Sequence, residues 1–169
     1  KVLPAPEENK TLIIHNQRIE SAISFLDTAL SSSNDISGAV FLPDGPNVRG
    51  CKMDIKKTFK LNDLKQEGSI TAFRIEGTKN SIDQRIENLV KELKILHLNI
   101  SVLEIHQSDI FWSKVKSLEF FSSSKNNIFR IVIPPSESVS LIYQFSNKFM
   151  YYLDWGGALM WMEAFELSE

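Results

Sequence analysis

The residues best suited to chemistry in this sequence are arginines and acids on apolar, strand-like runs. Arg130 is the one charged residue in the run 128–133. A guanidinium binds a carboxylate through two parallel hydrogen bonds, so Arg130 is a candidate for holding an acidic substrate. Arginines in strands also point to solvent or pair with a neighbouring acid, and this alternative stays open. For Arg74, which has Glu76 two residues later on the same strand face, we favour a structural ion pair.

Asp154 is the second candidate, because it stands directly before Trp155, Gly156 and Gly157. An aspartate at a turn commonly accepts hydrogen bonds from backbone N–H groups, and we favour this interpretation. A carboxylate role beside a redox cofactor is the alternative.

The two glycines lie between apolar, aromatic runs in the segment 151–162. Glycine readily adopts the positive φ of tight hairpin turns, so this pattern predicts a strand–turn–strand unit. A bulge, or the close approach of another backbone or of a ligand, would also require glycine.

Other reactive side chains give weaker signals. Cys51 is the single cysteine, and its basic neighbours Arg49 and Lys52 could lower the pKa of its thiol. We interpret it as an incidental thiol in a loop. A structural zinc site is not expected, because no ligand spacing links the three histidines, which are His15, His97 and His106. The sequence also lacks glycine-rich loops that bind phosphate or nucleotide.

Composition places the chain among ordinary globular domains. Its 169 residues are 43% hydrophobic and 24% charged, with a net charge of −2. That balance gives no electrostatic case for nucleic acid or an anionic membrane surface. No apolar run approaches the roughly 20 residues that span a bilayer, and no signal peptide is visible. The absence of an initiator Met predicts a fragment or a processed chain.

Apolar periodicity predicts the elements that must position these residues. We expect helices over 18–31, from a capping box at Ser81 and Gln84 to Leu93, over 108–121 and over 139–145. We expect strands over 11–15, 36–42, 69–76, 100–105 and 128–133, before the hairpin at 151–162.

This order predicts an α+β fold. Residues 11–106 read β-α-β-β-α-β, the order of a ferredoxin-like unit with a mainly antiparallel sheet and helices on one face. Residues 107–169 predict a second, incomplete unit of the same kind, so 11–169 form a single domain. Residues 1–10 are expected to be a linker. The polar stretch 44–68 is expected to be an irregular excursion with a short strand at 57–61.

An ordered set of short strings resembles one protein family, the FAD-binding E subunit of bacterial glycolate oxidase. The strings are Ser-Gly-Ala-x-x-Leu-Pro at 37–43, Phe-Arg-Ile-Glu-Gly at 73–77, Arg85, Phe111-Trp112, Phe-Arg-Ile-x-Ile-Pro-Pro at 129–135 and Tyr-x-Asp-Trp-Gly-Gly-x-Leu-x-Trp at 152–161. The family often has His where Phe41 stands and Arg where Lys116 stands, so the substrate does not transfer directly.

The resemblance implies the cap, or substrate, domain of a flavoprotein of the vanillyl-alcohol-oxidase type, which oxidises glycolate to glyoxylate in an intact complex. It implies an N-terminal flavin domain in the same subunit, a paralogous flavin subunit and an iron–sulfur subunit as partners. It implies a cytoplasmic location, or a peripheral one at the inner membrane through the complex. Arg130 matches the family's arginine before the two prolines, and Trp155, Gly156 and Gly157 are where a flavin domain would approach.

Three functional hypotheses follow. In the first, the chain is a cap domain that by itself is catalytically silent and holds no FAD, because the cofactor is bound mainly by another domain. In the second, it is a non-enzymatic module that binds a small metabolite. In the third, it is a structural domain for assembly of subunits.

Overall fold

The computed structural model describes residues 6–43, 68–122, 124–144 and 149–164. Cys51, the stretch 44–67 and the short strand expected at 57–61 lie outside the described residues. The described elements are β1 (Glu8–His15), α1 (Ile19–Ser31), β2 (Ile36–Leu42), β3 (Ile70–Gly77), α3 (Lys79–Glu92), β4 (Ile100–Leu103), α4 (Ile105–Lys116), η1 (Glu119–Phe121), β5 (Ile128–Val132), α5 (Pro135–Gln144), β6 (Phe149–Asp154), η2 (Trp155–Gly157) and β7 (Leu159–Ala164).

The strands form one antiparallel sheet in the order β4-β1-β3-β2-β6-β7-β5. The first four strands have the order of a ferredoxin-like unit, with β3 inserted between β1 and β2. In the second unit β7 is likewise inserted between β5 and β6. The α+β fold and its two ferredoxin-like units, the second one incomplete within the described residues, are therefore confirmed.

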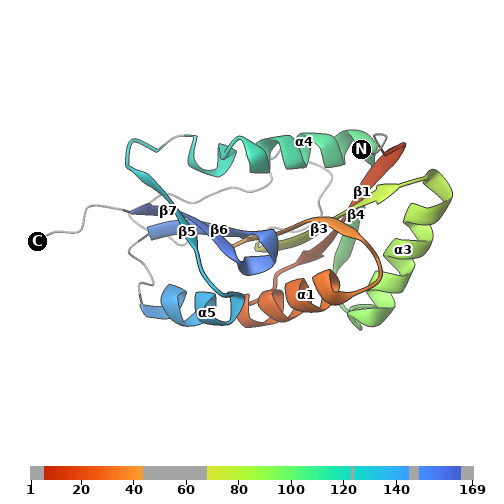
Figure 1. Cartoon of the computed structure of the whole chain (residues 1–169), viewed down its shortest axis with the longest axis horizontal. Coiled ribbons are helices and arrows are strands. Elements are labelled where there is room, and N and C mark those ends of the chain that lie inside the picture. The colour runs from red at the N-terminus through yellow and green to blue at the C-terminus, as the bar shows by residue number, and fades with distance from the viewer. Residues whose placement is uncertain (1–5, 44–67, 123, 145–148, 165–169) are drawn as a thin grey trace, which may run out of the picture.

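Helices cover both faces of this sheet, as Figure 1 shows. Helices α1, α3 and α5 lie on one face and α4 lies on the other. The expectation of helices on one face is therefore confirmed for α1, α3 and α5 and is wrong for α4. In α1 every third or fourth residue is buried, and these residues are Ile19, Ala22, Leu26 and Ala29. In α4 the buried apolar residues are Phe111 and Val115, four positions apart.

The strand alternation explains the two apolar cores. In β1, Leu12 and Ile14 face the core under α1 and α3, while Ile13 faces the core under α4. Because successive side chains of a strand point to opposite faces, a sheet covered on both sides needs a continuous apolar run. That is why 11–15 lacks the alternation of a half-exposed strand.

Three predicted boundaries were wrong. The capping box at Ser81 is absent, because α3 begins at Lys79 and Ser81 lies inside the first turn, where its hydroxyl donates to the Thr78 carbonyl. The strand predicted over 100–105 ends at Leu103, since Ile105 already begins α4. The helix predicted over 108–121 breaks at Leu118, whose φ of 56° is left-handed.

Two other elements begin earlier than expected. Helix α5 begins at Pro135, a favourable first position because proline lacks the N–H that would have no partner there. Strand β1 begins at Glu8, so the last residues of the expected linker 1–10 already pair with β3. Among the described helices none has the length and apolar character of a membrane span.

Candidate functional site

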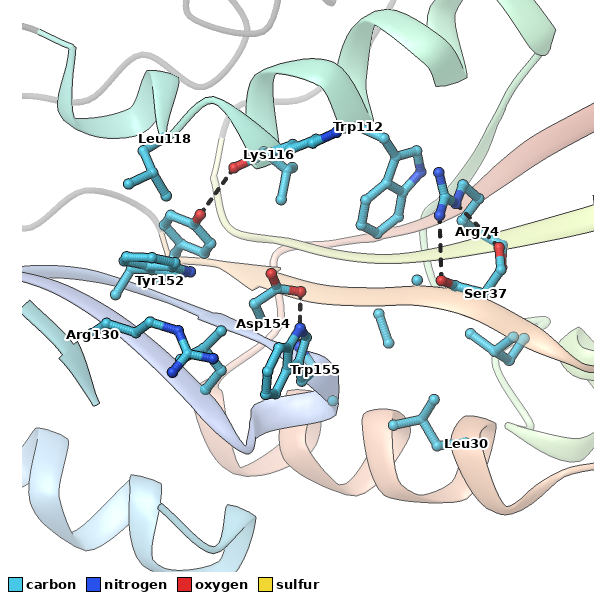
Figure 2. A pocket seen from close by; sticks show the side chains of 17 residues that line it. Leu30, Ser37, Arg74, Trp112, Lys116, Leu118, Arg130, Tyr152, Asp154 and Trp155 are labelled. Atoms are coloured by element: carbon cyan, nitrogen blue, oxygen red, sulfur yellow. Dashed lines mark hydrogen bonds between the residues drawn. The ribbon is translucent and has the colours of Figure 1, made fainter. Parts of the chain in front are cut away.

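A cavity of about 580 Å³ opens where the two ferredoxin-like units meet. Its lining comes from both units, from α4 on one side and α1 on the other, as Figure 2 shows. The lining residues are Leu30, Ile36, Ser37, Gly38, Ala39, Arg74, Trp112, Val115, Lys116, Leu118, Arg130, Tyr152, Asp154, Trp155, Gly156, Leu159 and Trp161.

The cavity has a cause in the strand pairing. Strands β2 and β6 are adjacent in the sheet, but one residue pair joins them, Phe41 with Leu153. Strand β6 then ends at Asp154 and the chain turns through η2. The sheet therefore opens on one side of that pair, and side chains line the space between the two units.

Arg130 lies at this cavity as a cation held by aromatic rings. Its guanidinium carbon is 4.9 Å from the centroid of the Trp155 ring and 6.0 Å from that of Trp161. Trp161 is its direct cross-strand partner on β7. Arg130 makes no ion pair within the described residues, so its N–H donors are available to a ligand. Pairing with a neighbouring acid, one of the arrangements left open by the sequence, is not what the described residues show. Arg130 lines the cavity and is also exposed to solvent, so the solvent-facing arrangement is partly borne out.

Asp154 lines the same cavity and holds the hairpin turn. Its Oδ1 accepts a hydrogen bond of 2.8 Å from the backbone N–H of Trp155, which confirms the turn role expected from the sequence. Burial raises the pKa of its carboxyl, while the bond from Trp155 and the charge of Arg74 act in the opposite direction. A carboxylate with a raised pKa is a better proton acceptor at neutral pH.

Arg74 differs from Arg130 because its N–H donors and its charge already have partners within the protein. Its Nε donates to the Ser37 hydroxyl at 3.1 Å, and the same nitrogen is 3.7 Å from a Glu76 carboxylate oxygen. Its guanidinium carbon also stacks 5.3 Å from the Trp112 ring centroid. The structural ion pair predicted for Arg74 and Glu76 is confirmed.

The α4 side of the cavity carries contacts that the sequence analysis did not predict, although it named Lys116 as a departure from the family. Lys116 brings a second positive charge with no ion pair inside the described part of the chain. The Tyr152 hydroxyl donates a 3.0 Å hydrogen bond to the Val115 carbonyl, which ties β6 to α4. No local pattern indicates these contacts, because α4 and β6 are separated by the whole of β5 and α5.

Two lining residues other than glycine have left-handed backbones. Leu118 has φ 56° and Trp155 has φ 51°. Such a conformation is costly for residues with a Cβ, and it persists where the surroundings enforce it, often at functional sites. At Trp155 it places the indole, 57% exposed, beside Arg130.

Gly156 and Gly157 are explained by the turn and by helix α1. Both have positive φ, 65° and 94°. A Cβ on Gly156 would come within 2.0 Å of Leu30 Cδ1, and one on Gly157 within 2.7 Å of Ile23 Cδ1. The predicted hairpin is confirmed, with β6 and β7 paired from Phe149 to Asp154.

The fold and the cavity define a two-unit α+β domain with a cationic, aromatic pocket. The chain is similar in structure to a 4-ethylphenol oxidase from Gulosibacter chungangensis in an isoeugenol complex, with a TM-score of 0.57 and 14% identity. The match covers 97% of this chain and 40% of the oxidase, so the chain spans about two-fifths of that protein's length. At this identity the likeness shows the fold alone. No protein-family model and no curated protein matches the sequence.

Proposed function

We propose that this chain is the cap, or substrate, domain of a flavin-dependent oxidoreductase of the vanillyl-alcohol-oxidase type. The observation that carries the proposal is Arg130, a pocket-lining guanidinium that aromatic rings hold and that no carboxylate among the described residues neutralises. The structural likeness to part of a 4-ethylphenol oxidase supports it. The oxidoreductase activity of the whole protein is likewise proposed.

The proposed substrate is a 2-hydroxy acid, with glycolate, oxidised to glyoxylate, as the smallest member of the class. Arg130 binds the substrate carboxylate through two N–H donors, which fixes the position of C2. Lys116 adds positive charge that attracts an anion into the cavity. Arg74 is less suited to this task because Ser37 and Glu76 already accept its hydrogen bonds and charge.

In the intact protein, a bound FAD would supply the two-electron oxidant to which the hydride from C2 of the substrate is lost. The hydroxyl proton must then go to a base, and Asp154 is the carboxylate of the cavity whose burial makes it more basic. The products are the 2-oxo acid, the reduced cofactor and a proton on the base, so atoms and electrons balance.

The residues at the cavity entrance fit a flavin domain that covers the cavity from outside. Trp155 keeps more than half of its surface exposed next to Arg130. In the proposal this indole is where the flavin domain of the same subunit approaches. Gly156 and Gly157 are not needed for that approach, since they are buried against α1. A paralogous flavin subunit and an iron–sulfur subunit are the further partners that we propose.

The test uses the full-length protein that carries the flavin domain. We expect Arg130→Ala to raise KM for glycolate or a larger 2-hydroxy acid at least tenfold, because a charge-assisted pair of hydrogen bonds is lost. Arg130→Lys should recover part of the loss, since it keeps the charge and loses the forked geometry. Arg18→Ala is the matched control, an exposed arginine at the start of α1 and outside the cavity. Unchanged kinetics in Arg130→Ala would refute the role.

A non-enzymatic metabolite-binding module is the second candidate function. It is favoured by the fact that the cavity and its cations lie wholly within this chain. The full-length protein would then bind small carboxylates through Arg130 without any flavin absorbance and without reducing an electron acceptor.

A further inference from the structure

The size of the cavity is the first clue to the substrate beyond its carboxylate. At about 580 Å³ it falls within the range of roughly 300–1,000 Å³ typical of sites that enclose drug-sized ligands. A two-carbon acid would leave most of this volume to water. An occupant that fills the cavity must be several times larger than glycolate.

The strand register places aromatic residues along the floor of the cavity. Arg130, Trp161 and Tyr152 lie directly opposite one another on β5, β7 and β6. Adjacent strands are about 4.8 Å apart, so roughly 10 Å separates the backbone of Arg130 from that of Tyr152. Tyr152 is only 1% exposed, so the aromatic surface next to a carboxylate on Arg130 comes from Trp161 and Trp155.

Large apolar side chains stand on both sides of that floor, among polar and charged lining residues that include Lys116 and Asp154. Trp155 and Leu30 stand on the α1 side, and Trp112 and Leu118 on the α4 side, as Figure 2 shows. Leu30 is 46% exposed and Trp155 57% exposed, so apolar surface is left for a ligand to cover. Flat ring faces of this kind bind flat apolar groups in stacked or edge-on arrangements.

We infer that the acid taken by this pocket carries a flat apolar group beyond C2, an aryl ring or one of similar size, and that glycolate is a poor occupant. The inference rests on the proposed function for the position of the carboxylate at Arg130. It adds the chemical class of the rest of the molecule. The ring lies over Trp161 and between Trp155 and Leu118.

The first experiment compares acids of increasing size on the full-length, flavin-bearing protein. Glycolate, lactate and 3-phenyllactate share the reacting carbon and differ in the group on C2. One methylene in an apolar pocket is worth roughly 10- to 200-fold in specificity. We expect kcat/KM to rise at least tenfold from glycolate to 3-phenyllactate. A value for glycolate that equals or exceeds that for 3-phenyllactate would overturn the inference and leave the proposed function standing.

The second experiment measures the binding preference of the pocket separately from catalytic turnover. Phenylacetate and acetate lack the C2 hydroxyl, so calorimetry on the same protein measures binding alone. We expect phenylacetate to bind at least tenfold more tightly than acetate, and Trp155→Ala to reduce that preference about fivefold or more. Leu96→Ala, at a residue 76% exposed and outside the cavity, should leave the preference unchanged.

The combined outcomes distinguish the two claims. If no hydroxy acid is oxidised but the phenylacetate preference depends on Trp155, the proposed function fails and the inference about the pocket holds. If acetate binds as tightly as phenylacetate, the inference fails whatever the turnover. Trp155→Leu serves as a second variant that keeps apolar bulk and loses the ring, should the alanine variant be poorly folded.

Discussion

The guanidinium carbon of Arg130 lies 4.9 Å from the ring centroid of Trp155, although one residue is on the outermost strand β5 and the other is in the turn after β6. Trp155 reaches this position because its φ is 51°, which turns the indole toward the cavity. The pair joins the substrate-binding candidate to the hairpin, so the geometry of the turn sets the position of the cation.

A double-mutant cycle tests this pair. Removing either partner abolishes the contact, and the coupling between Arg130→Ala and Trp155→Ala in urea unfolding should be about 0.5–1 kcal/mol, the value for cation–π pairs at exposed sites. The control cycle combines Arg130→Ala with Leu96→Ala, in the loop between α3 and β4, and its coupling should be near zero. Equal coupling in the two cycles would mean that the contact contributes nothing.

The two glycines of the turn should differ in their tolerance of a side chain. Alanine at either position adopts a left-handed backbone, which costs roughly 1–2 kcal/mol. We expect Gly157→Ala to destabilise the chain more than Gly156→Ala, because a φ of 94° lies farther from the left-handed minimum near 57°. Chemical denaturation of the two variants measures the order.

A rescue variant checks the steric part of that cost. The Cβ of Gly156→Ala would meet the tip of Leu30, a flexible side chain that is 46% exposed. Adding Leu30→Ala should therefore return part of the stability lost in Gly156→Ala. A purely additive double variant would argue against the close approach.

We predict that Asp154 makes the folding stability depend on pH, with a sign that follows from the burial of its carboxyl. Burial raises the pKa of this carboxyl above its unfolded value of about 3.9, so its contribution to stability is fully present below that value and is lost as pH rises through the folded pKa. Asp154→Asn keeps an acceptor for the Trp155 N–H and removes the titration. Wild type should gain stability relative to this variant as pH falls from 7 toward 4.

Parallel urea unfolding of wild type and Asp154→Asn at several pH values measures this difference. Contributions from the other acids cancel, because both proteins contain them. A difference that stays constant with pH, or that grows in favour of wild type toward neutral pH, would contradict the prediction.

A buried hydroxyl anchors helix α4 to the sheet. Thr11 Oγ1 accepts a 2.8 Å hydrogen bond from Trp112 Nε1 and lies 2.7 Å from the Ser108 hydroxyl. Thr11→Val keeps the shape and leaves the Trp112 N–H without its acceptor, so we expect a loss of about 1–3 kcal/mol in unfolding free energy. Thr28→Val, at an exposed position of α1 where the hydroxyl bonds its own helix, should change stability by less than about 0.5 kcal/mol.

The first ferredoxin-like unit was predictable because its signals are local. Its strands are continuous apolar runs, its helices have one buried face, and the order of elements leaves few sheet topologies. The boundaries failed where tertiary contacts override local pattern. Leu118 adopts a left-handed backbone that its residue type disfavours, and Ile105 begins a helix instead of ending a strand.

The sequence by itself determined the class of fold, the hairpin at Gly156 and Gly157, and the identity of Arg130 and Asp154 as the candidates worth following. These follow from residue type and short-range spacing. Only the tertiary structure decided that Arg130 and Asp154 line one cavity, that Arg74 is occupied by Ser37 and Glu76, and that α4 supplies Trp112 and Lys116. The reason is physical: the cavity exists because β2 and β6 share one residue pair and then separate, and the separation of two strands far apart in sequence leaves no mark in either of them.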